Sequence, residues 1–137
     1  MLLNPFLLEK AFTQTRKQVP PDLGVKMKNR RHNALKKAYN RLIENPYIDY
    51  ENGTMLILSD SVTEKGEAKF YRTCRRECRL IEPQNVLCHA FWEGFPCWHK
   101  ATLEIVENYL LIESCFKREQ MKTVDSVNSL GVAGVNS

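Results

Sequence analysis

Apolar residues near the start of the chain recur at helical spacing. The pair Asn4-Pro5 fits a helix N-cap followed by proline at the first helical position. The run Val19-Pro20-Pro21-Asp22 ends the pattern. The apolar face of this first predicted helix consists of Phe6, Leu7, Leu8, Ala11 and Phe12.

A second helical pattern extends from about Val25 to Glu44, where Asn45-Pro46 stops it. Its apolar stripe consists of Leu35, Ala38, Tyr39, Leu42 and Ile43. The spacing of these residues predicts a helix that buries one face and exposes the others.

Strand patterns follow in the middle of the chain. Residues 47–50 and 54–58 flank Glu51-Asn52-Gly53, and Asn-Gly between two such runs predicts a β-hairpin. Residues 68–74 alternate well enough for a third strand, and residues 79–81 predict a short fourth strand that Pro83 ends. A last helix is expected from Trp98 to about Phe116, with Ala101, Ile105, Tyr109 and Ile112 on its core face.

The predicted fold class is therefore α+β. A small antiparallel sheet and a C-terminal helix enclose a zinc site in a ββα-like arrangement, preceded by a helical N-terminal extension. At 137 residues, one domain plus tails is the natural expectation. We assign residues 1–45 to a basic helical extension, residues 46–117 to the zinc-binding α+β domain, and residues 118–137, which lack aromatic residues, to a disordered tail.

Charge is mildly positive overall and strongly so in one segment. The formal net charge is +4, but between Arg16 and Arg41 nine basic residues accompany a single acid, Asp22. Phosphate binding needs such a concentration of cations. The candidate nucleic-acid-binding residues are Lys26, Lys28, Arg30, Arg31, Lys36, Lys37 and Arg41, with a second cluster at Arg72, Arg75 and Arg76. The competing interpretation is a solvated helix face.

The five cysteines are an odd number, and the N-terminus has no basic region followed by a long apolar run. These features argue against a secretion signal and a disulfide framework, and they favour reduced thiols in a cytoplasmic protein. No run of 18 apolar residues exists, so no membrane span is expected.

Three metal-competent side chains lie within twelve residues of one another. Cys97 and His99 flank one residue at the start of the last predicted helix, and Cys88 precedes them across the Gly94-Phe95-Pro96 turn. Zinc prefers four tetrahedral Cys and His ligands. For the fourth ligand we place Cys78 first, and its rivals are Cys74 and His89.

The segment from Cys88 to Ala101 resembles the SWIM zinc finger, whose pattern is Cys-x-Cys, a spacer and Cys-x-His. The match lies in Cys88-His-Ala-Phe, Gly94-Phe-Pro and Cys97-Trp-His-Lys-Ala. The predicted hairpin, strand and helix lie where a ββα unit would place them, so the resemblance extends over residues 47–111. The first family cysteine falls at Val86, which cannot bind zinc, and Cys78 would replace it.

The resemblance implies a binding protein without catalytic activity. We expect one structural zinc held by Cys78, Cys88, Cys97 and His99. The expected partner is nucleic acid, with DNA favoured over RNA, or alternatively a protein bound by a zinc-finger adaptor. No pair of acids is placed for acid–base or two-metal chemistry, and neither a membrane nor a small-molecule substrate is expected.

Overall fold

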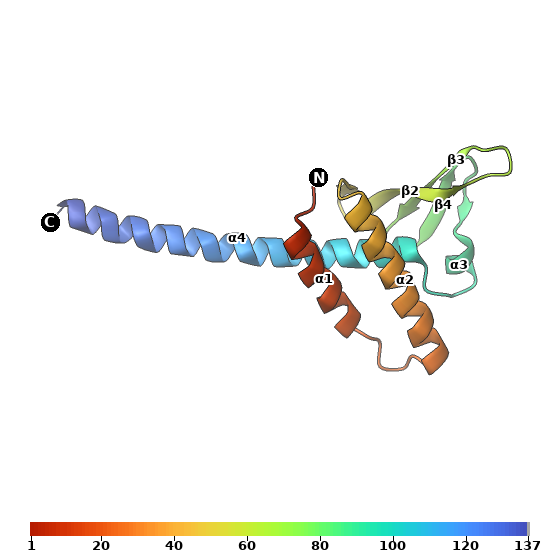
Figure 1. The fold of residues 1–137 in the computed structure, drawn as a ribbon, viewed down its shortest axis with the longest axis horizontal. Helices are drawn as coiled ribbons and strands as arrows, with labels where there is room; N and C mark the ends of the chain where they lie inside the picture. The colour runs from red at the N-terminus through yellow and green to blue at the C-terminus, as the bar shows by residue number, and fades with distance from the viewer. Residues whose placement is uncertain (137) are drawn as a thin grey trace.

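The computed structural model describes the backbone of residues 1–136 and the side chains of residues 1–121. The helices are α1 (Pro5–Lys17), α2 (Val25–Glu44), the short α3 (His89–Trp92) and α4 (Trp98–Asn136). The strands are β1 (Asp49–Glu51), β2 (Thr54–Val62), β3 (Ala68–Thr73), β4 (Cys78–Glu82) and β5 (Val86–Leu87). Figure 1 shows α1 and α2 crossing the long helix α4, with the sheet at one end of the molecule.

The fold is α+β, as predicted. The five strands form one antiparallel sheet in the order β1-β2-β3-β4-β5, so each strand pairs with the next along the chain. The predicted hairpin between β1 and β2 is confirmed, with Glu51 opposite Thr54 and positive φ angles at Asn52 and Gly53. Such angles are those that Asn-Gly adopts readily in a two-residue turn.

The two N-terminal helices begin and end close to the predicted residues. The Asn4 side chain accepts hydrogen bonds from the backbone N–H groups of Phe6 and Leu7, which confirms it as the N-cap of α1. The chain before α1 is also fixed, because the backbone N–H of Leu3 donates to the carbonyl of Pro46 and that of Asn4 to the Tyr109 hydroxyl.

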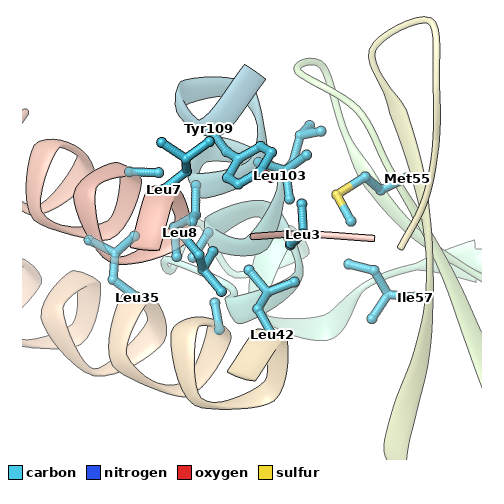
Figure 2. Packing of buried hydrophobic residues seen from close by; sticks show 14 residues of the cluster. Leu3, Leu7, Leu8, Leu35, Leu42, Met55, Ile57, Leu103 and Tyr109 are labelled. Atoms are coloured by element: carbon cyan, nitrogen blue, oxygen red, sulfur yellow. The ribbon is translucent and has the colours of Figure 1, made fainter. Parts of the chain in front are cut away.

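A single hydrophobic core joins α1, α2, β2 and α4. Figure 2 shows Leu7 and Leu8 from α1 facing side chains of α2, α4 and β2. Tyr109 is 1% exposed, and Leu35 and Met55 are also buried. Residues 1–45, which were assigned to an extension, are thus packed into the same core as the segment that follows.

The sequence patterns missed several element boundaries. Strand β2 continues to Val62, beyond the predicted end at residue 58, and β5 and α3 were not predicted. Helix α4 begins at Trp98 as expected and continues to Asn136, beyond the predicted end near Phe116 (Figure 1). The predicted disordered tail, residues 118–137, lies mostly outside the residues whose side chains are described, and it stays a prediction. No helix among the described residues is long and apolar enough to cross a membrane.

Candidate metal centre

The β4–β5 hairpin brings the first two cysteines together. Leu80 pairs with Val86 and Arg79 with Leu87, so the antiparallel register continues to Cys78 and Cys88. The backbone N–H of Cys88 donates to the carbonyl of Cys78 across 2.9 Å. The nine residues between these cysteines are thereby folded into a hairpin, and its open end carries both thiols.

A short turn then returns the chain to the same point. After α3, Gly94 has a φ of +78°, a backbone conformation that side-chain-bearing residues rarely adopt. The N–H groups of Gly94 and Phe95 donate to the carbonyls of Phe91 and Ala90. This turn places Cys97 immediately before α4 and His99 in the first turn of that helix.

The four side chains form one compact, buried cluster. The ligand atoms of Cys78, Cys88, Cys97 and His99 all lie within 4.8 Å of one another. The Nδ1 atom of His99 is 3.7 Å from the Sγ atom of Cys88 and 3.6 Å from that of Cys97. A tetrahedral zinc ion with ordinary bond lengths places sulfur and nitrogen ligands about 3.6 Å apart. The cluster therefore has the donors and the spacing to hold a metal ion.

Two aromatic rings fix the orientation of the histidine. The His99 ring stacks on the Tyr71 ring with centroids 3.8 Å apart, and its centroid lies 4.3 Å from that of the Trp98 ring. The Nδ1 atom faces the thiols, and the buried Nε2 atom has no hydrogen-bond partner among the described residues. Contacts between rings thus orient His99. In many metal sites a hydrogen bond to the second ring nitrogen has this role.

Backbone N–H groups point at two of the sulfurs. The N–H of Lys100 donates to the Sγ atom of Cys97 across 3.3 Å, and that of Phe91 donates to the Sγ atom of Cys88. Such bonds stabilise a thiolate relative to a thiol. The peptide groups around the turn are therefore arranged for the ionised form that binds metals.

The three thiols strongly perturb one another. Contact with the Cys78 thiol, followed by contact with that of Cys97, lowers the pKa of Cys88. Contacts with Cys88 and Cys97, together with burial, raise the pKa of Cys78. Without a cation, one thiolate at this site makes the next one harder to form. A divalent cation would stabilise all three thiolates at once. The donor set is therefore better suited to binding a metal than to forming a core of three neutral cysteines.

The structure separates Cys78 from its two rivals. Cys74 is only half-buried, lies in the β3–β4 turn and is not a member of the cluster. The His89 side chain is 89% exposed and its Nε2 atom lies 3.9 Å from a carboxylate oxygen of Glu93. Cys115 is exposed on α4. The fourth member of the cluster is thus Cys78, the first residue of β4.

The predicted basic residues do not share one face. Lys26, Arg30, Lys37 and Arg41 are separated by four, seven and four residues, which places them along one side of α2. That side faces the metal half, because Arg30 lies 3.9 Å over the Phe95 ring and Lys37 lies 5.0 Å over the Trp98 ring. We call these four residues the basic flank.

The other predicted cations lie elsewhere. Lys28 is exposed on the opposite side of α2, whereas Lys36 is exposed beside the basic flank and lines a shallow hollow with Lys37 and Arg41. Arg75 accepts a hydrogen bond at its backbone carbonyl from the Nζ atom of Lys100 across 2.7 Å, and its guanidinium lies 3.4 Å from a carboxylate oxygen of Glu107 on α4. Arg72 pairs in register with Arg79 and, by strand alternation, lies on the opposite sheet face from Tyr71. Arg76 is exposed in the β3–β4 turn.

Arg31 has a structural role that the sequence analysis missed. Its side chain is 13% exposed, and it forms an ion pair of 2.8 Å with Glu104 of α4. It also donates to the carbonyls of Thr15 and Gln18 at the end of α1. Arg31 precedes Leu35 by four residues, so its position on the buried stripe was visible in the spacing.

We expect Arg31→Gln to destabilise the protein by about 1.5–3 kcal/mol. The substitution leaves two carbonyls without their charged donor, and hydrogen bonds to charged groups contribute about that much. Urea denaturation measures the loss. Lys36→Gln, a control on the exposed side of the same helix, should change the unfolding free energy by less than about 0.5 kcal/mol. Equal stability of the two variants would contradict the role given to Arg31.

No protein-family model matches the sequence, and neither a curated protein nor a solved structure matches it. A cluster of three cysteines and one histidine does not by itself identify a SWIM domain. The resemblance to that family therefore stays a prediction that rests on the spacing of Cys88, Cys97 and His99.

Proposed function

We propose that this chain is a zinc-stabilised protein that binds nucleic acid and has no catalytic activity of its own. The observation that carries the proposal is the position of the basic flank directly beside the metal cluster. Contacts of Arg30 with Phe95, and of Lys37 and Arg41 with Trp98, hold this flank against the turn and helix that bear Cys97 and His99.

Zinc is the metal that the donor set favours. Three thiolates and one imidazole in a tetrahedral arrangement form a common structural zinc site, and soft sulfur ligands disfavour magnesium and calcium. When bound, zinc would cross-link β4, the start of α3 and the start of α4. Four protein ligands fill its coordination shell, so the site has no open position at which a substrate could bind.

Nucleic acid is favoured because part of the positive charge is not neutralised. Lys26, Lys28 and Lys36 are exposed and form no ion pair among the described residues. Lys37 lies 3.7 Å from Asp60, but both side chains are more than 40% exposed, so this pair is weak. Cations at helical spacing can neutralise successive phosphates and release their counterions.

A protein adaptor is the second candidate, and the outer sheet face favours it. Leu56, Leu58 and Phe70 are 41%, 53% and 40% exposed on neighbouring strands. They line a cavity of about 300 Å³ together with residues of β1 and the end of α2. Apolar side chains gathered on a surface are typical of protein contacts.

The basic flank gives the test of nucleic-acid binding. We expect the double variant Lys26→Gln, Lys37→Gln to bind a labelled oligonucleotide on the order of tenfold more weakly at 50 mM salt. Its dependence on salt should also be flatter, because fewer counterions are released. Fluorescence anisotropy at 50 and 200 mM salt measures both effects.

The matched control is Lys28→Gln, Lys65→Gln, which removes the same charge from the opposite side of α2 and from the β2–β3 turn. If both double variants lose affinity equally, net charge rather than the basic flank drives binding. If the wild-type chain binds no nucleic acid at either salt concentration, the proposed function is wrong and the adaptor role takes its place.

A further inference from the structure

A cavity beside the metal cluster has no role in the function proposed so far. It has a volume of about 340 Å³, at the lower end of the range of about 300–1,000 Å³ that small-molecule sites occupy. The first half of α2 and the loop before it form one wall. The Gly94-Phe95-Pro96 turn and the start of α4 form the other.

Two aromatic rings line this cavity, and a cation lies over each of them. The guanidinium of Arg30 is 3.9 Å from the centroid of Phe95, and the Nζ atom of Lys100 is 5.1 Å from that of Phe91. In each pair the cation covers one face of the ring, so a planar group would contact the opposite face or the edge, with a positive charge close by.

The charged side chains that line the cavity are Arg31, Lys100 and Glu104, and Arg30 lies over one of its rings, so the local charge is net positive. Glu104 is the acid among the lining residues, and it is bonded to Arg31 across 2.8 Å. Lys100 donates to the backbone carbonyl of Arg75, which is neutral, so its charge is not compensated there. An occupant with an apolar planar part and a negative part fits this distribution.

An exposed tryptophan adjoins Phe91 along the chain. Trp92 follows Phe91 on α3, and 72% of its surface is accessible. Tryptophan is seldom left so exposed without a partner, because its ring is large and mostly apolar. Phe91 and Phe95 lie under Lys100 and Arg30, and Trp92 adds a third, exposed ring within the same five residues of chain.

We propose that this cavity accepts an unpaired base of a single-stranded nucleic acid. Arg30 and Lys100 contact the adjoining phosphates, and Trp92 stacks on a neighbouring base. The inference deepens the proposed function and depends on it. Single strands are favoured over duplexes because the faces of a base in a duplex are covered by its neighbours, whereas an unpaired base can stack on a protein ring.

The cavity should accept DNA and RNA alike. A protein distinguishes the two at a given site through the 2′-hydroxyl, which is a hydrogen-bonding group. Among the described residues that line the cavity, the side chains are apolar or charged apart from the buried thiol of Cys97. No hydroxyl or amide side chain lines the cavity, and its acid, Glu104, is already paired with Arg31, so no side chain there is placed to select a 2′-hydroxyl.

The test compares oligonucleotides on the full-length, zinc-loaded protein. Labelled 12-nucleotide single strands of DNA and RNA, and the matching DNA duplex, are titrated by fluorescence anisotropy at 50 mM salt. We expect both single strands to bind at least about tenfold more tightly than the duplex, and within about threefold of each other. Trp92→Ala and Phe95→Ala should each weaken single-strand binding by about fivefold to a hundredfold, since a stacked base contributes about that factor.

Two further variants make the result specific. Phe6→Ala removes another exposed aromatic ring, 61% accessible and on α1, and should leave affinity unchanged. Phe95→Leu keeps an apolar side chain but loses the ring, so it tests stacking if Phe95→Ala does not fold. Zinc content and circular dichroism verify the fold of every variant.

The outcomes separate this inference from the function on which it depends. Equal or tighter binding of the duplex, with the Trp92 and Phe95 variants unaffected, would overturn the single-strand site while nucleic-acid binding stands. If the affinities for single-stranded RNA and DNA differ by tenfold or more, the site does recognise the sugar, and that part of the inference is wrong. If no nucleic acid binds at all, both proposals are wrong.

Discussion

Cys78→Ser should lose the bound metal, whereas Cys74→Ser should retain it. The two cysteines lie at opposite ends of the same β3–β4 turn, but only the Cys78 sulfur is in the cluster of four ligand atoms. We expect the metal content to fall from about one zinc per chain to near zero after dialysis of the Cys78 variant against a weak chelator. Atomic absorption measures the content of both variants.

Loss of the metal should also unfold the segment around the cluster. Cys78, Cys88 and Cys97 are packed against Tyr71, Ala90 and Phe91, which form a small group outside the main core. A group of that size buries little apolar surface, and in zinc-finger peptides the metal contributes about 10–16 kcal/mol of apparent binding free energy that is also folding free energy. Near-ultraviolet circular dichroism of Tyr71 and Trp98 should change on metal removal.

Cys74→Ser is a close control because it removes a thiol of the same size four residues away. Its metal content and thermal stability should match those of the wild-type chain. If Cys74→Ser loses the metal and Cys78→Ser keeps it, the ligand set proposed here is wrong. If neither variant loses metal, the cluster holds the ion through fewer than four protein ligands.

Acid should release the metal, and the sign follows from the ligands. Thiolates and neutral imidazole bind a metal, and protons compete for the same atoms. Stability provided by the metal is therefore present at neutral pH and is lost as the pH falls. The Lys100 N–H bond to Cys97 and the Phe91 N–H bond to Cys88 favour thiolates and oppose this loss.

Spacing along the chain identified three of the four cluster residues. Cys88, Cys97 and His99 are separated by one turn and the start of a helix, and local structure alone brings them together. Cys78 required the β4–β5 hairpin, and β5 has only two residues, Val86 and Leu87, which is too short to show alternation. The pattern could therefore propose Cys78 but not separate it from Cys74.

Two neighbouring arginines show that a charge pattern along the chain does not give the direction of each side chain. Arg30 and Arg31 were both candidate nucleic-acid-binding residues, but successive helix residues point about 100° apart. Arg30 consequently lies over Phe95, whereas Arg31 lies among α1, α2 and α4. The hydrophobic stripe of α2 contained this information, because Arg31, Leu35, Ala38 and Leu42 follow helical spacing.

The rings that hold His99 could not be found from the sequence. Tyr71 comes from β3 and contacts the histidine through tertiary structure, since the two residues are far apart along the chain. Trp98 adjoins His99, but its contact with Lys37 depends on how α2 packs against α4. Neither contact produces a periodic pattern of residues, so neither could be predicted from the sequence.

Leu8→Ala should destabilise the whole protein, including the metal half. Leu8 is 2% exposed and belongs to the core that joins α1, α2, β2 and α4 (Figure 2). Replacing a buried leucine by alanine removes apolar contacts and leaves a cavity, at a cost of about 2–5 kcal/mol. For a chain of this size, that loss is a large part of the total stability of about 5–15 kcal/mol.

The shape of the unfolding transition tests whether residues 1–45 form a separate unit. Because one core includes Leu8 of α1 and Met55 of β2, we expect a single cooperative transition that shifts to lower temperature in Leu8→Ala. Metal release, followed with a chromogenic chelator, should shift by the same amount as far-ultraviolet circular dichroism. Phe6→Ala replaces a nearby residue that is 61% exposed. It should change the free energy of unfolding by no more than about 0.5 kcal/mol and leave both transitions near the wild-type temperature. Release of metal at the wild-type temperature in Leu8→Ala would show instead that the metal half folds independently of α1.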